Sequence, residues 1–142
     1  MQTGLAKAPM FKTLIVEDNS AFRQSLSAML NARFPDMMLV EVDSGDEALK
    51  QMDKLHPDLV FMDVKLPNAN GLDLTKIIKA EHANTTVVVM TSSDLPEYRQ
   101  AAFLCGASYF VSKSATTEAQ IFSVVESVRY ESEYLSTISN PL

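Results

Sequence analysis

Five short runs rich in apolar and β-branched residues alternate with longer stretches whose apolar residues recur at helical spacing. The runs cover residues 14–16, 38–42, 58–62, 86–90 and 108–111. The stretches between and after them predict helices that begin near residues 20, 44, 72, 94–96 and 118. Parallel strands need such helical crossovers. We therefore expect an α/β domain in which helices cover both faces of a parallel sheet.

Capping and turn residues predict where these elements end. Asn19 or Ser20 can cap the first helix and Ser44 the second, and Gly106 is placed to end the fourth. Residues 64–71 contain one proline, two asparagines and one glycine and predict a loop. We expect a flexible segment over residues 1–9, one domain over residues 10–130 and a C-terminal tail or truncated linker over residues 131–142.

Charge and cysteine usage limit the possible partners. The 142 residues carry a formal net charge of −6, and no cluster of basic residues offsets it, which argues against direct nucleic-acid binding by this chain. Cys105 is the only cysteine, so no intramolecular disulfide can form. No apolar stretch approaches membrane-spanning length, and the first ten residues lack a signal-peptide core. These features predict a soluble, cytoplasmic protein without membrane association.

Polar residues follow three of the predicted strands. Glu17 and Asp18 come directly after residues 14–16, Asp63 after residues 58–62 and Thr91 after residues 86–90. The carboxyl ends of neighbouring parallel strands meet at one edge of the sheet, so three carboxylates and a hydroxyl would share one pocket. Such carboxylates repel one another unless a cation is present. Oxygen ligands suit a hard ion such as Mg²⁺, and a free carboxylate beside it can attack phosphorus.

Four separated motifs stand in a fixed order after predicted strands. They are Val16-Glu17-Asp18-Asn19, Asp63 with Pro67 and Gly71 downstream, Thr91-Ser92-Ser93, and Gly106-Ala107 leading to Lys113. With this combination, the chain resembles a response regulator receiver domain of bacterial two-component signalling over about residues 12–128. The resemblance implies a doubly wound, flavodoxin-like (βα)5 sandwich with strand order 2-1-3-4-5.

The resemblance also implies a role for each acidic residue. Asp63 corresponds to the phosphoacceptor, which forms an aspartyl phosphate with a phosphoryl group from a sensor histidine kinase, a phosphotransfer protein or a small phosphodonor. Asp18 and Asp63 would bind Mg²⁺ or Mn²⁺ directly, and Glu17 would bind it through water. The backbone carbonyl of Lys65 would supply a further oxygen ligand. By this resemblance the chain is a signal-transduction phosphoprotein, limited to self-phosphorylation and slow self-dephosphorylation.

The remaining motif residues correspond to the phosphoryl-contacting and switch positions of receivers. Lys113 would contact the aspartate and then a phosphoryl oxygen, while Thr91 and Ser92 lie at the hydroxyl positions. Phe110 would turn inward when Thr91 moves. These changes would switch the face made by the fourth helix, fifth strand and fifth helix, and phosphorylation would favour a homodimer through that face, with Leu95, Tyr98 and Arg99 at the fourth helix.

Two positions depart from the commonest receiver pattern. Ser114 follows Lys113 where many receivers have proline, so we expect no cis peptide there, because a non-proline cis bond costs about 2.5–4 kcal/mol. Phe110 replaces a tyrosine and so lacks its hydroxyl. Lys113-Ser114 resembles receivers joined to helix-turn-helix output domains, although no such module follows in this sequence. The chain would control either a separate partner or an output domain absent from it, with transcription as one output.

Structural roles compete with these functional ones. Thr91 can be an ordinary strand residue, Phe110 a core residue, and Lys65 a solvated loop charge. His56 and His82 lie at predicted helix ends, where a basic side chain suits the helix dipole.

Two other functions are also compatible with this type of fold. A metal-dependent phosphatase with an aspartate nucleophile generally needs an acid two residues later, where this chain has Lys65. The presence of Glu17, Asp18, Asp63, Thr91 and Lys113 together argues against a binding module that takes up no phosphate.

Overall fold

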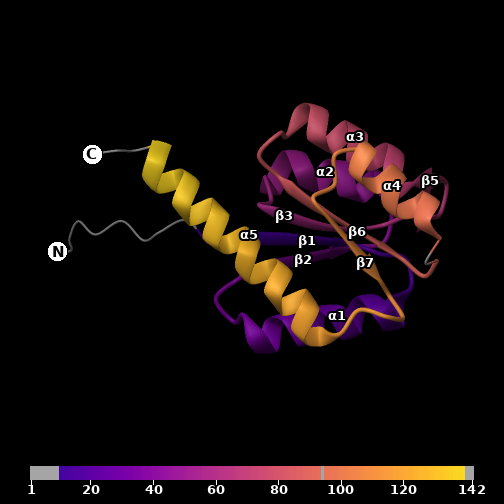
Figure 1. The fold of residues 1–142 in the computed structure, drawn as a ribbon, viewed down its shortest axis with the longest axis horizontal. Coiled ribbons are helices and arrows are strands. Elements are labelled where there is room, and N and C mark those ends of the chain that lie inside the picture. Colours follow the sequence, from indigo (N-terminus) through magenta and orange to yellow (C-terminus); the bar gives the residue numbers. More distant parts are fainter. Residues whose placement is uncertain (1–9, 94, 140–142) are drawn as a thin grey trace.

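The computed structural model describes residues 10–93 and 95–139, except for the side chains of residues 135–139. Five strands form one parallel sheet in the order β2-β1-β3-β6-β7 (Figure 1). This order confirms the expected 2-1-3-4-5 arrangement. The strands are β1 (Lys12–Val16), β2 (Met38–Val42), β3 (Leu59–Asp63), β6 (Thr86–Thr91) and β7 (Tyr109–Ser112).

Helices cover both faces of the sheet. On one face lie α2 (Gly45–Leu55), α3 (Gly71–Glu81) and α4 (Pro96–Leu104), whose buried side chains share a core with Leu14, Val60 and Val87. On the other face lie α1 (Ser20–Arg33) and α5 (Glu118–Ser139), which pack against Ile15 and Phe61. The two cores arise because alternate residues of each strand point to opposite faces.

The central strand, β3, shows why its sequence is a continuous apolar run. All five of its residues are buried, and Phe61 is fully buried. Complete burial of such a side chain contributes about 1.5–3 kcal/mol relative to exposure. Because helices cover both faces, this strand shows no alternation of polar and apolar residues.

The predicted caps account for the ends of three helices. Asn19 Oδ1 accepts a hydrogen bond from the Phe22 N–H at 3.0 Å, and Ser44 Oγ accepts one from Glu47 at 3.3 Å. Gly106 has φ 105° and follows α4. Its N–H donates to Phe103 O, and the N–H of Ala107 donates to Ala102 O, each at 3.0 Å, which is the Schellman arrangement.

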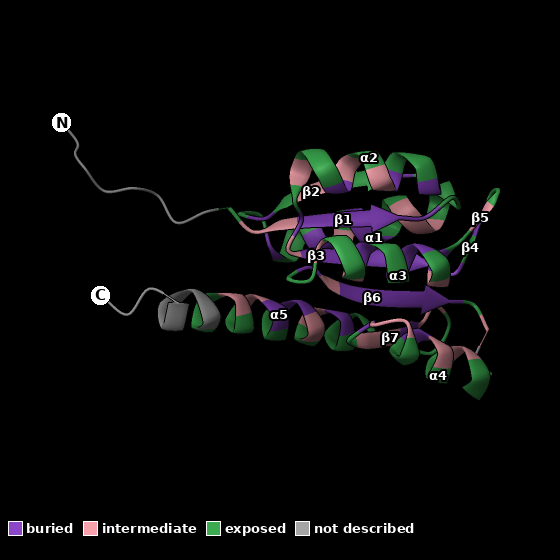
Figure 2. Cartoon of the chain, turned by 90° about the horizontal axis from the view of Figure 1, so that it is seen from above, coloured by how far each residue is buried: buried purple, intermediate pink, exposed green. Residues whose placement is uncertain are grey.

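The last helix is longer than expected. It continues past residue 130 to Ser139, so most of the expected tail over residues 131–142 is helical (Figure 1). The C-terminal part of α5 projects past the sheet (Figure 2). Among the described residues Val128 is the last of this helix in the core, so no packing requires an apolar stripe beyond it. Tyr130 and Tyr134 stack on each other in this segment, with ring centroids 6.4 Å apart. Residues 1–9 and 140–142 lie outside the described part of the chain.

Smaller differences concern loops and strand ends. Residues 64–71 contain a hairpin of β4 (Lys65–Leu66) and β5 (Ala69–Asn70), with Asn68 at φ 58° between them. Strands β3 and β7 both begin and end one residue later than expected, which makes Asp63 the last strand residue. Helix α4 begins at Pro96, and the alternative start at Asp94 lies outside the described residues.

Within the described ranges, no helix is both long and apolar enough to cross a membrane.

Candidate functional site

Strands β1 and β3 bring three carboxylates together at the carboxyl edge of the sheet. Val16 pairs with Met62, so Glu17 and Asp18 leave β1 next to Asp63 at the end of β3. One oxygen from each of the three side chains lies within 4.8 Å of the other two. Glu17 and Asp63 are buried, whereas Asp18 is exposed. The cluster therefore has two buried carboxyl groups and one exposed carboxylate.

Glu17 is fully buried, and its two side-chain oxygens have different surroundings. Oε2 accepts a hydrogen bond from the Asn19 backbone N–H at 3.1 Å. Oε1 accepts no hydrogen bond from any described residue, although Lys113 Nζ lies 2.5 Å away. The contact with Lys113 is therefore an ion pair without hydrogen-bond alignment. A buried carboxylate in this state needs the nearby cation, because desolvation penalises its charge.

Lys113 directs its ammonium group into the acidic cluster from the end of β7. Its backbone N–H donates to Thr91 O at 2.9 Å, which continues the β6–β7 ladder past Ser112. Its Nζ lies 3.3 Å from Asp63 Oδ2, besides the contact with Glu17. One cation thus faces two buried carboxylates, and the site keeps an excess of negative charge.

Burial and the excess of negative charge together raise the pKa of Asp63 to about 7. Burial is the largest cause, followed by hydrogen bonding and repulsion from the neighbouring Glu17 carboxylate. Lys113 acts in the opposite direction but only partly compensates. In the metal-free protein, Asp63 therefore holds a proton at pH values at which an exposed aspartate, with its ordinary pKa of 3.8, has already lost it.

We predict that the metal-free protein loses stability as pH rises toward 8. Because the pKa of Asp63 is higher in the folded state than in the unfolded state, its contribution is fully present below about pH 4. It disappears as pH rises through about 7. The loss is at most about 4 kcal/mol, since one pKa unit corresponds to about 1.4 kcal/mol. Urea unfolding in EDTA between pH 5 and 8 measures this loss. The prediction would be contradicted if the unfolding free energy changed with pH equally in the wild type and in Asp63→Asn.

The donor set of the cluster fits a hard divalent cation. Glu17, Asp18 and Asp63 offer only carboxylate oxygens, and no imidazole or thiol belongs to the group. Mg²⁺ and Mn²⁺ prefer such ligands. A cation would also reduce the repulsion between carboxylates that contributes to the raised pKa of Asp63. The three acids together are therefore more stable with a bound cation than without one.

The other expected site residues lie around this cluster with differing exposure. Thr91 is buried, and its Oγ1 accepts a hydrogen bond from the Ser93 N–H at 3.0 Å, whereas Ser92 is exposed. Phe110 is half-buried beneath Arg99, whose guanidinium lies 4.9 Å from the ring centroid. The side chain of Lys65 is exposed, and its backbone pairs with Asn70 in the β4–β5 hairpin.

Gly71 explains how the loop after Asp63 is held against the site. A Cβ at this position would lie 1.9 Å from the carbonyl oxygen of Asp63, so only glycine permits this approach. The Gly71 N–H donates to Val64 O at 2.8 Å, and Asn70 Oδ1 caps the start of α3 through the Leu72 N–H. The amino end of α3 is thereby fixed against the Asp63 backbone.

The segment between β7 and α5 is held by hydroxyl groups in place of the usual proline. No cis peptide bond occurs among the described residues, as expected for Ser114. Thr116 Oγ1 accepts from the Ser112 N–H at 3.0 Å, and Ser112 Oγ accepts from the Ala115 N–H at 3.2 Å. Thr117 and Gln120 then form a reciprocal capping box at the start of α5.

Sequence reasoning missed two residues of α1 that support the site. Arg23 donates from Nη1 to Glu17 O at 2.7 Å and pairs with Glu41 at 3.3 Å. The Phe22 ring lies under the Lys113 ammonium, 4.9 Å from ring centroid to Nζ. Helical side chains lean toward the amino end of their helix, so residues in the first turn after Asn19 were placed to reach back to the acidic loop.

Comparison with known proteins identifies the family. The family model "Response regulator receiver domain" matches residues 13–126. The chain belongs to this family. Receiver domains are phosphoacceptor signalling modules, and the sheet order and acidic cluster described above agree with that membership.

Known relatives and structures are similar to this receiver domain to different extents. Response regulator GacA of Pseudomonas syringae pv. syringae (strain B728a) is 34% identical over 107 residues, which cover 75% of this chain and 50% of that protein. Transcriptional regulatory protein YdfI of Bacillus subtilis (strain 168) is 26% identical over 120 residues, which cover 84% and 56%. The receiver domain therefore spans about half the length of these relatives.

A solved structure shows the same fold. The crystal structure of a signal receiver domain from Vibrio parahaemolyticus has a TM-score of 0.83 at 18% identity and covers 92% of this chain and 98% of that one. At this identity the likeness concerns the fold alone.

Proposed function

We propose that this receiver domain accepts a phosphoryl group on Asp63 in a reaction that depends on Mg²⁺ or Mn²⁺. The observation that carries the proposal is the convergence of Glu17, Asp18, Asp63 and Lys113, with Lys113 Nζ 2.5 Å from Glu17 and 3.3 Å from Asp63. This arrangement combines a nucleophilic carboxylate, two further acids for a cation and a fixed positive charge. The family implies a sensor histidine kinase as the donor.

In the proposed reaction, an Asp63 carboxylate oxygen attacks the phosphorus of a phosphohistidine. A P–O bond forms, the P–N bond breaks, and the imidazole leaves with its electron pair and takes up a proton. Bound Mg²⁺ would supply positive charge beside the phosphoryl oxygens. Asp18 and Asp63 would hold the metal directly and Glu17 through water, together with the Lys65 carbonyl. Lys113 would give up its contact with Asp63 and contact a phosphoryl oxygen instead. The hydroxyl groups of Thr91 and Ser92 would approach the other phosphoryl oxygens.

Stoichiometry distinguishes this function from its two rivals. We expect the wild-type chain, incubated with acetyl phosphate and Mg²⁺, to gain one phosphoryl group and then to lose it slowly. Intact-protein mass spectrometry measures the gain, and EDTA should prevent it. Catalytic release of phosphate over many turnovers would favour an aspartate-nucleophile phosphatase. An unmodified mass under all conditions would favour a module that binds partners without phosphorylation.

We further propose that phosphorylation switches the face made by α4, β7 and α5. Phe110 is half-buried on β7, where Arg99 of α4 covers its ring, so an inward movement of Phe110 would release Arg99. Loss of that contact would change the exposed α4 surface, which includes Leu95. A local charge change at Asp63 would in this way reach a protein-binding surface.

Beryllofluoride, a mimic of the phosphoryl group, is expected to shift this receiver domain from monomer toward dimer through that face. Sedimentation velocity with Mg²⁺, with and without beryllofluoride, measures the shift. Asp63→Asn is the matched control, because the amide lacks the anionic oxygen to which beryllium would bind. Identical sedimentation of the wild type in both conditions would contradict dimerisation.

The regulated output is proposed from the relatives. YdfI is described as a transcriptional regulatory protein, and this receiver domain spans about half the length of YdfI and GacA. We propose that this chain likewise regulates transcription, through an output domain or a separate partner. Its net charge of −6 supports an indirect role at DNA.

A further inference from the structure

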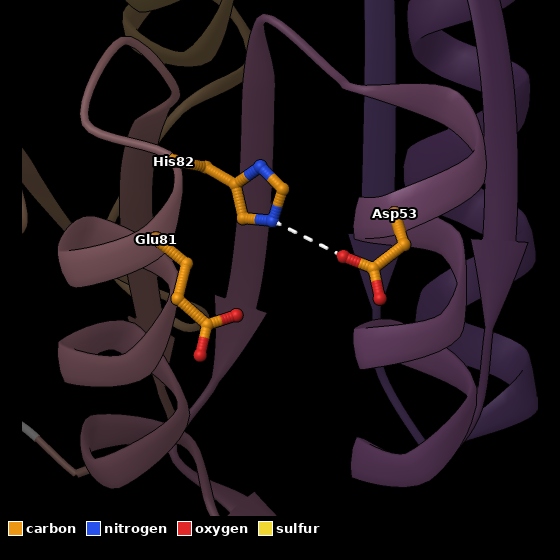
Figure 3. A group of neighbouring side chains, drawn as sticks. All are labelled: Asp53, Glu81 and His82. Atoms are coloured by element: carbon orange, nitrogen blue, oxygen red, sulfur yellow. Dashed lines mark ion pairs between the residues drawn. The ribbon is translucent and has the colours of Figure 1, made fainter.

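A second cluster of metal-ligating side chains lies between the carboxyl ends of α2 and α3. It consists of Asp53 in the last turn of α2, Glu81 at the end of α3 and His82 at its C-cap. Figure 3 shows all three side chains directed into the space between the two helices. His82 Nε2 lies 3.5 Å from Asp53 Oδ1, and one ligand atom from each residue lies within 4.8 Å of the other two.

The charges of this cluster favour a cation. Asp53 and Glu81 carry like charges on facing helices, and within the described residues neither pairs with a lysine or arginine. The ends of two helices add the partial negative charge of their last carbonyl groups. His82 offers an imidazole nitrogen at a distance too long for a strong hydrogen bond to Asp53. A divalent ion would neutralise the carboxylates and use this nitrogen.

The surroundings provide space and a firm base for such an ion. A hollow of about 200 Å³ is lined by the three residues and by apolar side chains that include Leu49, Met52 and Ile78. Met52 and Ile78 are almost fully buried in the core, which fixes the helices that carry the ligands. The ring of His56 lies 5.9 Å from that of His82, so a second imidazole lies close to the cluster.

We infer that Asp53, Glu81 and His82 form a binding site for a divalent transition ion, with Zn²⁺ as the ion that suits it best. Imidazole together with carboxylate is a ligand set for Zn²⁺, Ni²⁺ or Co²⁺, whereas Mg²⁺ prefers oxygen alone. The site differs in this respect from the all-oxygen cluster at Asp63. It also lies at the opposite edge of the sheet, because α3 ends where β6 begins and Asp63 stands at the carboxyl end of β3. An ion here would clamp α2 to α3.

The two histidines of the chain allow a direct test by NMR. Zn²⁺ is titrated into the full chain in the presence of excess Mg²⁺, and imidazole resonances are followed, with His56→Gln used for assignment. We expect the His82 resonances to shift with saturation near one equivalent and to return when EDTA is added. The Asp63→Asn variant should give the same titration, because its substitution lies in the other cluster.

The matched variant is Asp53→Asn/Glu81→Gln, which keeps side-chain size and leaves His82 in place. We expect its Zn²⁺ affinity to be at least about tenfold lower, since changes around metal ligands typically cost ten- to a hundredfold. Thermal unfolding in EDTA shows whether this variant is folded, and the single substitutions Asp53→Asn and Glu81→Gln replace it if it is not. Unmoved His82 resonances at one equivalent of Zn²⁺ would overturn the inference. An unchanged Zn²⁺ affinity in the folded double variant would also overturn the inference, because it would mean that Zn²⁺ binds to the His82 imidazole without the two carboxylates.

Discussion

Asp63→Asn is expected to abolish phosphoryl uptake completely, the largest effect of any single substitution in this receiver domain. The amide lacks the anionic oxygen that attacks phosphorus, and Lys113 Nζ lies 3.3 Å from the Asp63 carboxylate that this amide replaces. Intact-protein mass spectrometry after incubation with acetyl phosphate and Mg²⁺ measures the loss. A phosphorylated mass in Asp63→Asn would show that another residue is the acceptor.

Two controls separate this loss of chemistry from a loss of structure. Asp46→Asn makes the same chemical change at an exposed position of α2 and should leave uptake unchanged. Unfolding of Asp63→Asn in EDTA should show higher stability than the wild type near pH 8, because the amide removes one of two buried charges that repel each other. A folded, more stable protein that takes up no phosphate would identify Asp63 as the reactive group.

Lys113→Met is expected to have the second largest effect, and to act on stability as well as on activity. Glu17 is fully buried, and its Oε1 has no hydrogen-bond partner among the described residues, with the Lys113 ammonium 2.5 Å away. Removal of one partner from a buried ion pair typically costs about 3–5 kcal/mol, because the other charge remains desolvated. The free energy of unfolding in EDTA should fall by this amount near pH 8 and by less near pH 5, where Asp63 is protonated and the cluster carries one negative charge fewer.

A double-mutant cycle tests the origin of this effect. Glu17→Gln removes the charge that Lys113 balances, so it should restore much of the stability lost in Lys113→Met. Phosphoryl uptake should remain at least about a hundredfold slower in both variants, as found when a single transition-state donor is removed. Lys113→Arg keeps the charge and is the conservative control. Equal stability of Lys113→Met and the wild type at pH 8 would contradict the role given to this ion pair.

The fold was largely predictable because local rules and the global arrangement agree. Continuous apolar runs such as residues 59–62 predict strands buried on both faces, and β3 is such a strand. Asn19 and Ser44 begin helices and Gly106 ends one through hydrogen bonds to residues a few positions away in the chain. Because these interactions are local, the sequence alone was enough to predict them. The extension of α5 to Ser139 was missed because a helix without a core beside it carries no apolar period.

The sequence predicted which residues lie near one another in the candidate site, but it did not predict which side chains contact each other there. The position of Asp63, Glu17 and Asp18 after strands was enough to expect a shared acidic pocket. Side-chain directions decided the rest of the arrangement. Lys113 lies closer to Glu17 than to Asp63. Phe22 and Arg23 of α1 support the site. The cluster of Asp53, Glu81 and His82 was missed because its residues belong to two different helices. The sequence suggested only helix-end charges there.

By itself, the amino-acid sequence determined the order of strands and helices, the ends of most of them and the edge of the sheet where the acids meet. These features follow from periodicity, capping and turn chemistry, which act over a few residues. Only the tertiary structure decided which two carboxyl groups are buried, to which of them Lys113 lies closer and how far the pKa of Asp63 rises. Desolvation and Coulomb interaction depend on distances between groups far apart in the chain, and packing alone sets those distances.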